Sequence, residues 1–235
     1  MYNKVVYFKN LGEIKAVTFD IDGTLYREHK LNFRIIPHFL RHIVFFSKYG
    51  IARKELRKVD FYPDFEKAQA EIMSKKLKCS PEKAIEKLNH IVYTGLKKYF
   101  PRFNACKGVK ELIQKLKQNG IKIAVLSDFP PEQKGDIWGI KDYCDVVLGS
   151  EEIGALKPSP YVFTTLAKKL NTPAEEILYV GNHHEYDVIG PKKAGMKAAW
   201  FISPLKGWFN KKSKNADFTF YHYNQLEKYL FDNNL

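Results

Sequence analysis

The sequence is poor in cysteine and has no hydrophobic stretch long enough to cross a membrane. Its 3 cysteines, Cys79, Cys106 and Cys144, are widely spaced and form no Cys-x-x-Cys pair, which excludes a disulfide framework or a zinc site built from cysteines alone. No apolar run approaches the roughly 20 residues that span a bilayer, and the first residues are too polar for a signal peptide. We therefore expect a soluble protein of a reducing, cytoplasmic compartment that has no membrane partner.

Long runs of one charge are also missing, although the chain carries a formal net charge of +13. An excess of this size favours anionic partners such as phosphate esters, nucleic acid or an acidic surface. The lysines and arginines are scattered at helical spacing, however, and even the densest group, around residues 53–58, is no run of five. This distribution is typical of solvated helix faces, and nucleic acid is the less favoured partner.

The composition fits a folded chain with an α/β core. With 235 residues, 45% of them hydrophobic, the chain can bury one sizeable core and a second small one, which excludes a disordered chain, a collagen-like repeat or a coiled coil. Apolar runs rich in β-branched residues alternate with amphipathic stretches, and this order predicts a parallel sheet with helices on both faces. The predicted strands are 14–20, 121–126, 146–148, 177–181, 197–202 and 216–220, and the predicted helices are 108–119, 133–138, 160–170, 191–194 and 224–230.

One region departs from that alternation. Residues 31–98 show helical periodicity without a convincing strand, and Ser80 followed by Pro81 resembles the start of a helix. We expect a helical domain over residues 28–100, inserted into a sheet domain that comprises 1–27 and 101–235.

The first polar cluster follows the first predicted strand. Asp20 and Asp22 stand two residues apart and Gly23 permits a tight turn, so both carboxylates can face one crevice. One carboxylate can then attack an electrophile while the other exchanges protons with the leaving group. A plain turn has the same pattern, but an EF-hand is disfavoured because Leu31 occupies the position of its last ligand.

Three further clusters lie at or beyond predicted strand ends. Ser127 and Asp128 follow strand 121–126, where a hydroxyl can hold a phosphoryl oxygen, and no Gly-x-Ser-x-Gly motif supports a serine hydrolase. Lys157, which precedes a proline, can place a positive charge on a phosphate. Asn182 and Asp187 follow strand 177–181 and offer oxygen ligands for a hard cation such as Mg²⁺. Taken singly, each has an ordinary alternative: a cap, a surface lysine or a helix N-cap.

In this order the four clusters resemble the motifs of the haloacid dehalogenase-like hydrolase superfamily. The matching segments are Asp20-Ile-Asp22-Gly-Thr-Leu25, Ser127, Lys157-Pro158, and Gly181-Asn182 with Asp187, within residues 14–203. The resemblance implies a Rossmann-like parallel sheet and a helical cap domain inserted after the first motif.

The resemblance also implies catalytic roles. Asp20 would be the nucleophile that forms an aspartyl-phosphate, and Asp22 would be the general acid and then the general base. Ser127 would hold the transferring phosphoryl group, and Lys157 would balance its charge. The substrate contacts would include Gly23, Thr24 and Asp128.

A magnesium ion is the implied cofactor. Its ligands would be the Asp20 side chain, the backbone carbonyl of Asp22, and the loop that contains Asn182 and Asp187. Asn182 departs from the family, which usually has aspartate there, and so removes one negative charge. His183 and His184 follow it, and either of them with Asp187 suggests a transition-metal site as an alternative to loop histidines that face solvent or substrate.

The resulting hypothesis is a magnesium-dependent phosphatase that acts on a small phosphorylated metabolite. Asp22 disfavours a dehalogenase, because halide needs no proton donor. A phosphomutase of the same superfamily and a basic nucleic-acid-binding protein with a degenerate site remain as alternatives. The sequence specifies neither the substrate nor the choice between a monomer and a homodimer, for which 218–223 is a candidate edge strand.

Overall fold

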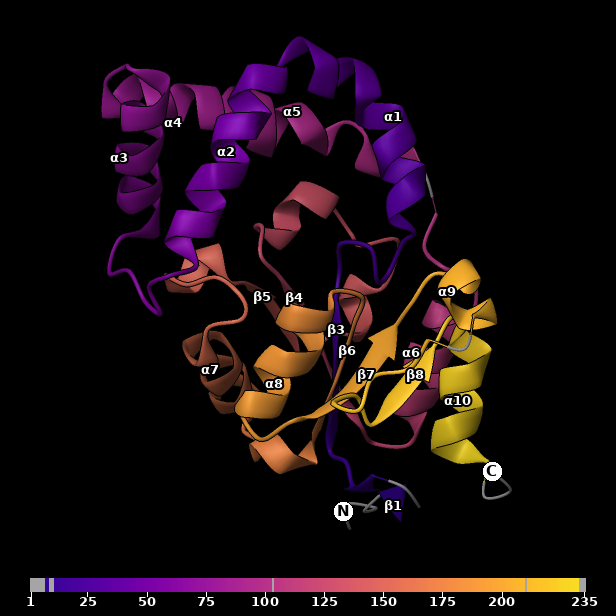
Figure 1. Cartoon of the computed structure of the whole chain (residues 1–235). Helices are drawn as coiled ribbons and strands as arrows, with labels where there is room; N and C mark the ends of the chain where they lie inside the picture. The colour runs from indigo at the N-terminus through magenta and orange to yellow at the C-terminus, as the bar shows by residue number, and fades with distance from the viewer. Residues whose placement is uncertain (1–6, 9–10, 103, 210, 233–235) are drawn as a thin grey trace.

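Six parallel strands form the centre of the protein, in the order β5-β4-β3-β6-β7-β8 (Figure 1). The computed structural model describes residues 7–8, 11–102, 104–209 and 211–232. The strands of the sheet are β3 (Ala16–Asp20), β4 (Lys122–Ser127), β5 (Val146–Gly149), β6 (Ile177–Gly181), β7 (Lys197–Phe201) and β8 (Phe218–Phe220). A separate antiparallel pair is formed by β1 (Tyr7–Phe8) and β2 (Gly12–Glu13). The prediction of a parallel α/β sheet is therefore confirmed.

The position of β3 in the middle of the sheet follows from its sequence. All five of its residues are buried, as expected for a strand with both faces covered. Its neighbours are β4 and β6, and the register pairs Asp20 with Leu126 and Phe19 with Val180. The carboxyl ends of the three strands therefore lie side by side, at the edge where parallel sheets bind ligands.

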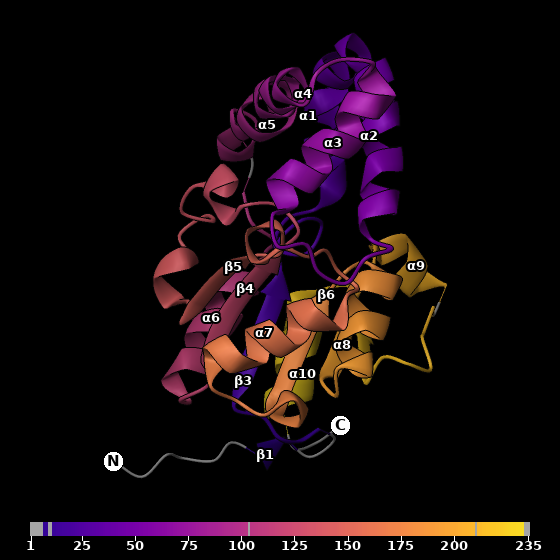
Figure 2. The same ribbon diagram turned by 90° about the vertical axis from the view of Figure 1, so that its left-hand side faces the viewer.

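Helices cover both faces of the sheet (Figure 2). Val17 and Phe19 of β3 belong to the apolar cluster that includes residues of α6 and α10, whereas Ala16 packs in the cluster that includes α7. This alternation matches the period of two along a strand. The helices of this part of the chain are α6 (Val109–Gln118), α7 (Pro160–Leu170), α8 (Gly190–Lys193), α9 (Pro204–Trp208) and α10 (Tyr223–Phe231).

A second group of helices stands over the carboxyl ends of the strands (Figures 1 and 2). They are α1 (Glu28–Arg41), α2 (Ile43–Leu56), α3 (Phe65–Leu77), α4 (Pro81–Leu88) and α5 (Thr94–Lys97), with a π-helical segment, η1 (Asn89–Tyr93), before α5. Ser80 caps α4, with Pro81 in its first turn, as the sequence predicts. Phe45, Met73 and Val92 belong to a buried cluster of this group.

The structure departs from the predicted elements at three places. Residues 133–138 do not form one helix, because a 3₁₀ turn (Pro131–Lys134) is followed by Gly135, Ile137 and Trp138 with positive φ. The pair β1–β2 and helix α9 were not predicted, because they are too short to show periodicity. In the described part of the chain, no helix is long and apolar enough to cross a membrane.

Candidate active site

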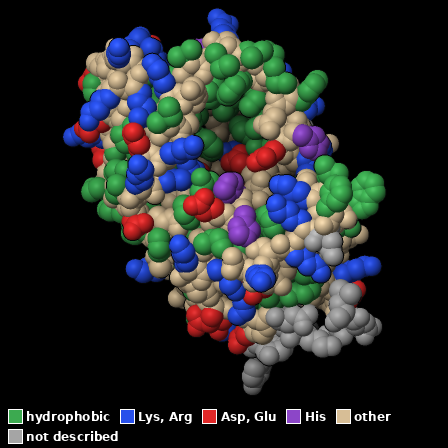
Figure 3. All heavy atoms as spheres, viewed as in Figure 1, with side chains coloured by type: hydrophobic (Ala, Val, Ile, Leu, Met, Phe, Trp, Pro, Cys, Tyr) green, Lys and Arg blue, Asp and Glu red, His purple; other side chains and the backbone are tan. Residues whose placement is uncertain are grey.

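The four sequence clusters meet at the carboxyl edge of the sheet. Asp20 ends β3, Ser127 ends β4, the Asn182 loop follows β6, and Lys157 lies between β5 and α7. A cavity of about 160 Å³ lies here, and Figure 3 shows a hollow with acidic side chains at this level, below the helical group. The cavity is lined by Asp20, Asp22, Glu28, Asp128, Phe129, Lys157, Asn182, His183, Tyr186 and Asp187.

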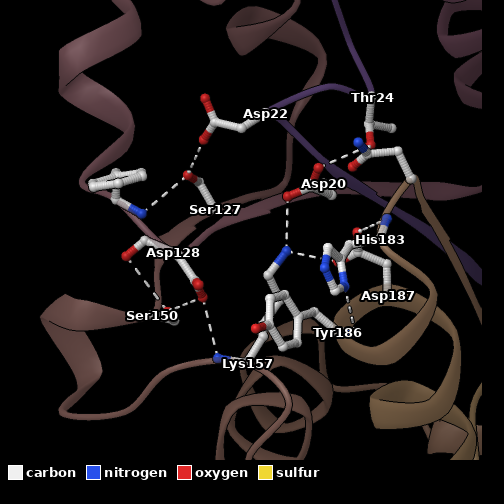
Figure 4. A network of polar contacts seen from close by, with 12 residues as sticks. Asp20, Asp22, Thr24, Ser127, Asp128, Ser150, Lys157, His183, Tyr186 and Asp187 are labelled. Atoms are coloured by element: carbon white, nitrogen blue, oxygen red, sulfur yellow. Dashed lines mark hydrogen bonds and ion pairs between the residues drawn. The ribbon is translucent and has the colours of Figure 1, made fainter. Parts of the chain in front are cut away.

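Lys157 joins two carboxylates at the centre of the site (Figure 4). Its Nζ lies 2.7 Å from Oδ1 of Asp20 and 2.7 Å from Oδ1 of Asp187, and all three side chains are buried. Burial raises the pKa of Asp20. The neighbouring carboxylates of Asp187 and Asp22 raise it further, whereas the positive charge of Lys157 opposes the rise. Burial alone would lower the pKa of Lys157, but Asp187 and Asp20 outweigh it and raise that pKa. The lysine is therefore a fixed positive charge beside the Asp20 carboxylate.

Three donors fix the second carboxylate, Asp22. Tyr26 donates to Oδ1 over 2.8 Å, Ser127 donates to Oδ2 over 2.9 Å, and Nζ of Lys134 lies 3.1 Å from the same Oδ2. The Asp22 side chain is 29% exposed, whereas that of Lys134 is fully buried. Asp22 is thus both oriented and accessible from the cavity, as a group that exchanges protons with a substrate must be.

The turn after β3 brings Gly23 and Thr24 into the site. Gly23 has φ of +84°, which favours glycine, and a Cβ there would collide with the side-chain amide of Asn182. The hydroxyl of Thr24 donates to Oδ2 of Asp20 over 2.8 Å. Thr24, which the sequence predicts as a substrate contact, therefore orients the Asp20 carboxylate in this structure.

Asp128 links the sheet to helix α2. Its Oδ2 lies 2.5 Å from Nη2 of Arg57 and 3.7 Å from Nη2 of Arg53, and its Oδ1 accepts hydrogen bonds from Ser150 and from the backbone of Lys157. Burial would raise the pKa of Asp128, but Lys157, Arg57 and Arg53 hold it below its usual value. Asp128 lines the cavity with both of its oxygens already paired, unlike a free substrate contact.

The segment after β6 holds Asp187 behind Lys157, on a π-helical turn (His184–Ile189) that the sequence did not predict. Oδ2 of Asp187 accepts a hydrogen bond of 2.9 Å from the backbone N–H of His183, so both of its oxygens have partners. Gly181 is required here, since a Cβ would collide with the Asp187 side chain. His183 stacks on Tyr186, and Nε2 of His184 lies 2.7 Å from the Ser213 hydroxyl.

Several residues of the site were not predicted from the sequence, among them Tyr26, Glu28, Arg57 and Lys134. Lys134 comes from the 3₁₀ turn after β4, and its Nζ lies 5.2 Å from the Phe100 ring centre and 5.0 Å from that of Phe129. No sequence signal distinguishes it or Arg57 in a chain with 39 lysines and arginines. Their roles come from contacts between distant segments.

The donors of the cavity suit a hard cation. Asp20, Asp22 and Asn182 line the cavity, and carboxylate, carbonyl and amide oxygens are ligands that suit Mg²⁺. Both oxygens of Asp187 already have partners, Lys157 and His183, and so have both oxygens of Asp20, Lys157 and Thr24. Within the described residues, no group of three or more histidine, cysteine, aspartate or glutamate side chains has a metal-binding arrangement.

Comparison with known proteins places the chain in one family. The model of the haloacid dehalogenase-like hydrolases matches residues 17–201. The chain is 28% identical over 192 residues to the glyceraldehyde 3-phosphate phosphatase of Methanopyrus kandleri, covering 78% of this chain and 82% of the relative. It is 28% identical over 208 residues to the putative pyrophosphatase PpaX of Caldanaerobacter subterraneus, covering 83% and 86%.

The fold agrees with this assignment. The crystal structure of a HAD phosphatase from Thermococcus onnurineus superposes with a TM-score of 0.61 at 23% identity, and the match covers 93% of this chain and 98% of that one. The likeness extends over both the sheet and the helical group. With its four motifs gathered at one edge of the sheet, the chain belongs to the haloacid dehalogenase-like hydrolases, as its sequence predicts.

Proposed function

We propose that the protein is a magnesium-dependent phosphatase that hydrolyses a small phosphorylated metabolite through an aspartyl-phosphate on Asp20. The observation that carries this proposal is the convergence of Asp20, Asp22 and Lys157 on one cavity. A nucleophile, a proton carrier and a fixed positive charge are the parts that phosphoryl transfer requires. The relatives named as phosphatases support the same chemistry.

In the first step, a carboxylate oxygen of Asp20 bonds to phosphorus as the bond from phosphorus to the leaving oxygen breaks. Asp22 gives its proton to that leaving oxygen, so an alcohol departs. The Ser127 hydroxyl, which donates to Oδ2 of Asp22 in this structure, donates instead to a phosphoryl oxygen, and Lys134 remains beside that Oδ2. Lys157 offsets the negative charge on the equatorial oxygens and on Asp20.

In the second step, the carboxylate of Asp22 takes a proton from water, and the water oxygen attacks phosphorus. The acyl-phosphate bond breaks, phosphate leaves, and Asp20 regains its carboxylate. Lys134 keeps Asp22 in place through both steps, because it is buried and 3.1 Å away. Asp187 acts through Lys157, which it holds by a second short ion pair.

Mg²⁺, held by Asp20, the Asp22 carbonyl and Asn182, would supply positive charge to the transferring phosphoryl group and favour the ionised form of Asp20.

The helices of residues 28–100 form the cap domain in this proposal. They stand over the site, and Arg57, the residue that follows α2, donates to Asp128 and to the backbone carbonyl of Lys157. A closed cap excludes water other than the reacting molecule. The 160 Å³ cavity is smaller than the 300–1,000 Å³ typical of drug-sized ligands, and this supports a small substrate.

The test is hydrolysis of a generic aryl phosphate by the purified protein with Mg²⁺. We expect turnover that is lost on chelation and restored by added Mg²⁺. Intramolecular phosphate transfer with weak hydrolysis would favour the phosphomutase. No turnover, together with nucleic-acid affinity that falls steeply with salt, would favour the binding protein.

A further inference from the structure

A carboxylate that no motif includes stands beside Asn182. Glu28, the first residue of α1, accepts a hydrogen bond of 3.1 Å at Oε1 from Nδ2 of Asn182. Both residues line the same cavity as Asp20 and Asp22. Glu28 lies at the solvent-exposed mouth of that cavity, whereas Asn182 is half-buried.

The contact depends on Gly23, which separates the two side chains from the backbone of the first motif. A Cβ at Gly23 would collide with the Asn182 amide and would lie 2.8 Å from Oε1 of Glu28. Since only glycine fits here, the turn lets the side chains of Asn182 and Glu28 meet beside the nucleophile strand.

The hydrogen bond determines which way the Asn182 amide faces. Its NH₂ group is directed to Glu28, so its oxygen takes the opposite side, where Oδ1 lies 3.4 Å from the Thr24 hydroxyl. That hydroxyl donates to Asp20. The amide oxygen therefore lies on the side of Thr24, the residue that also contacts the Asp20 carboxylate.

Glu28 also brings a charge that is not neutralised by an ion pair. Among the described residues, no lysine or arginine lies within 4.0 Å of its carboxylate. The adjacent Arg27 donates to the backbone carbonyls of Ile202 and Tyr221 instead. Asn182 and Glu28 together thus present one ligand oxygen and one negative charge, which a single aspartate at 182 would combine.

We propose that Glu28 is a positioning residue of the cation site: it holds the Asn182 amide oxygen toward Asp20 and supplies the negative charge that Asn182 lacks. The inference rests on the proposed function, because that function places Mg²⁺ between Asp20 and Asn182. It also ties the cation to the first turn of the cap, so cation binding and cap position are linked through one side chain.

The test measures cation binding directly, by calorimetry with Mn²⁺ and full-length protein in the absence of substrate. Mn²⁺ prefers the same oxygen ligands as Mg²⁺, and low ionic strength limits screening of the exposed carboxylate. Glu28→Gln keeps an acceptor for Asn182 but removes the charge, whereas Glu28→Ala removes both. Mutation of a residue that hydrogen-bonds to a metal ligand typically weakens metal binding about 10–100-fold. We therefore expect Glu28→Gln to raise the Kd for Mn²⁺ about tenfold and Glu28→Ala to raise it at least as much.

The matched control is Glu185→Gln, which removes one carboxylate from the exposed surface of the same loop and should leave the Kd unchanged. Asn182→Asp should restore the affinity of the Glu28→Gln variant, because it returns the missing charge. Thermal melting of each variant confirms that it is folded.

The outcomes separate the two proposals. If both Glu28 variants bind Mn²⁺ with the Kd of the wild type, the inference about Glu28 is wrong, but the phosphatase proposal still stands. An equal loss of Mn²⁺ affinity in Glu185→Gln also overturns the inference, because any negative charge near the site would then have the same effect as Glu28. If the wild type binds no Mn²⁺, the magnesium dependence fails and the inference fails with it.

Discussion

Nζ of Lys157 lies 2.7 Å from Oδ1 of Asp20, although 137 residues separate them in the sequence. The short contact joins the end of β3 to the loop after β5, in the buried centre of the site. The proposed nucleophile and its counter-charge are therefore in place before any substrate binds, and such preorganisation lowers the reorganisation needed in the transition state.

Replacement of the nucleophile should abolish turnover without unfolding the protein. In Asp20→Asn the amide can still accept from Thr24, and Lys157 keeps Asp187 as its partner. We expect turnover of an aryl phosphate to fall at least about 10³-fold, with a melting temperature within about 5 °C of the wild type. Steady-state rates and thermal melting check both. Activity within about tenfold of the wild type would remove Asp20 from this role.

Lys134 should matter for catalysis more than for stability. Lys134→Met removes the charge 3.1 Å from Asp22 but keeps a long side chain against Phe100 and Phe129. Loss of one preorganised donor costs about 10²-fold in kcat. The cost in stability should be smaller than for a fully buried pair, because Asp22 is 29% exposed and keeps Tyr26 and Ser127 as donors. The control is Lys141→Met at an exposed position. The same kcat in both variants would show that Lys134 has no part in the reaction.

Arg57 should hold the cap over the site. Arg57→Ala removes the hydrogen bonds to Asp128 and to the Lys157 backbone. A charged hydrogen bond contributes about 1.5–3 kcal/mol, so the closed population and kcat/KM should fall about tenfold or more. Hydrogen exchange of α2 amides should speed up in parallel. Lys54→Ala, at an exposed position of α2, serves as the control. Equal hydrogen exchange in the two variants would show that Arg57 does not hold the cap over the site.

Asp128 should contribute stability that is lost in acid. Lys157, Arg57 and Arg53 overcome the effect of burial and hold its folded pKa below 3.8. The unfolded state then binds more protons around that pH, so the contribution is present above the unfolded pKa and disappears as pH falls through the folded one. Asp128→Asn should cost about 3 kcal/mol at neutral pH. Urea unfolding from pH 7 to 3 should show the gap between the two proteins narrowing below about pH 4; a constant gap would contradict this.

Much of the fold could be predicted from sequence because its signals are local. The buried run at 16–20 and the amphipathic stretches at 109–118 and 160–170 carry their own periodicity, and all became the expected elements. Asp20, Ser127 and Gly181 end their strands, so a parallel sheet alone brings them to one edge. The prediction of a helix at 133–138 was wrong because Gly135, Ile137 and Trp138 have positive φ values there.

The sequence by itself determined the sheet, the helical insertion and the motif residues, since each depends on neighbours within a few positions. Only the tertiary structure decided that Lys134 reaches Asp22, that Arg57 reaches Asp128, and that Glu28 reaches Asn182. These contacts join segments that are up to 154 residues apart. Their partners depend on how the helical group sits over the sheet and how turns direct long side chains, and neither leaves a periodic signal in the chain.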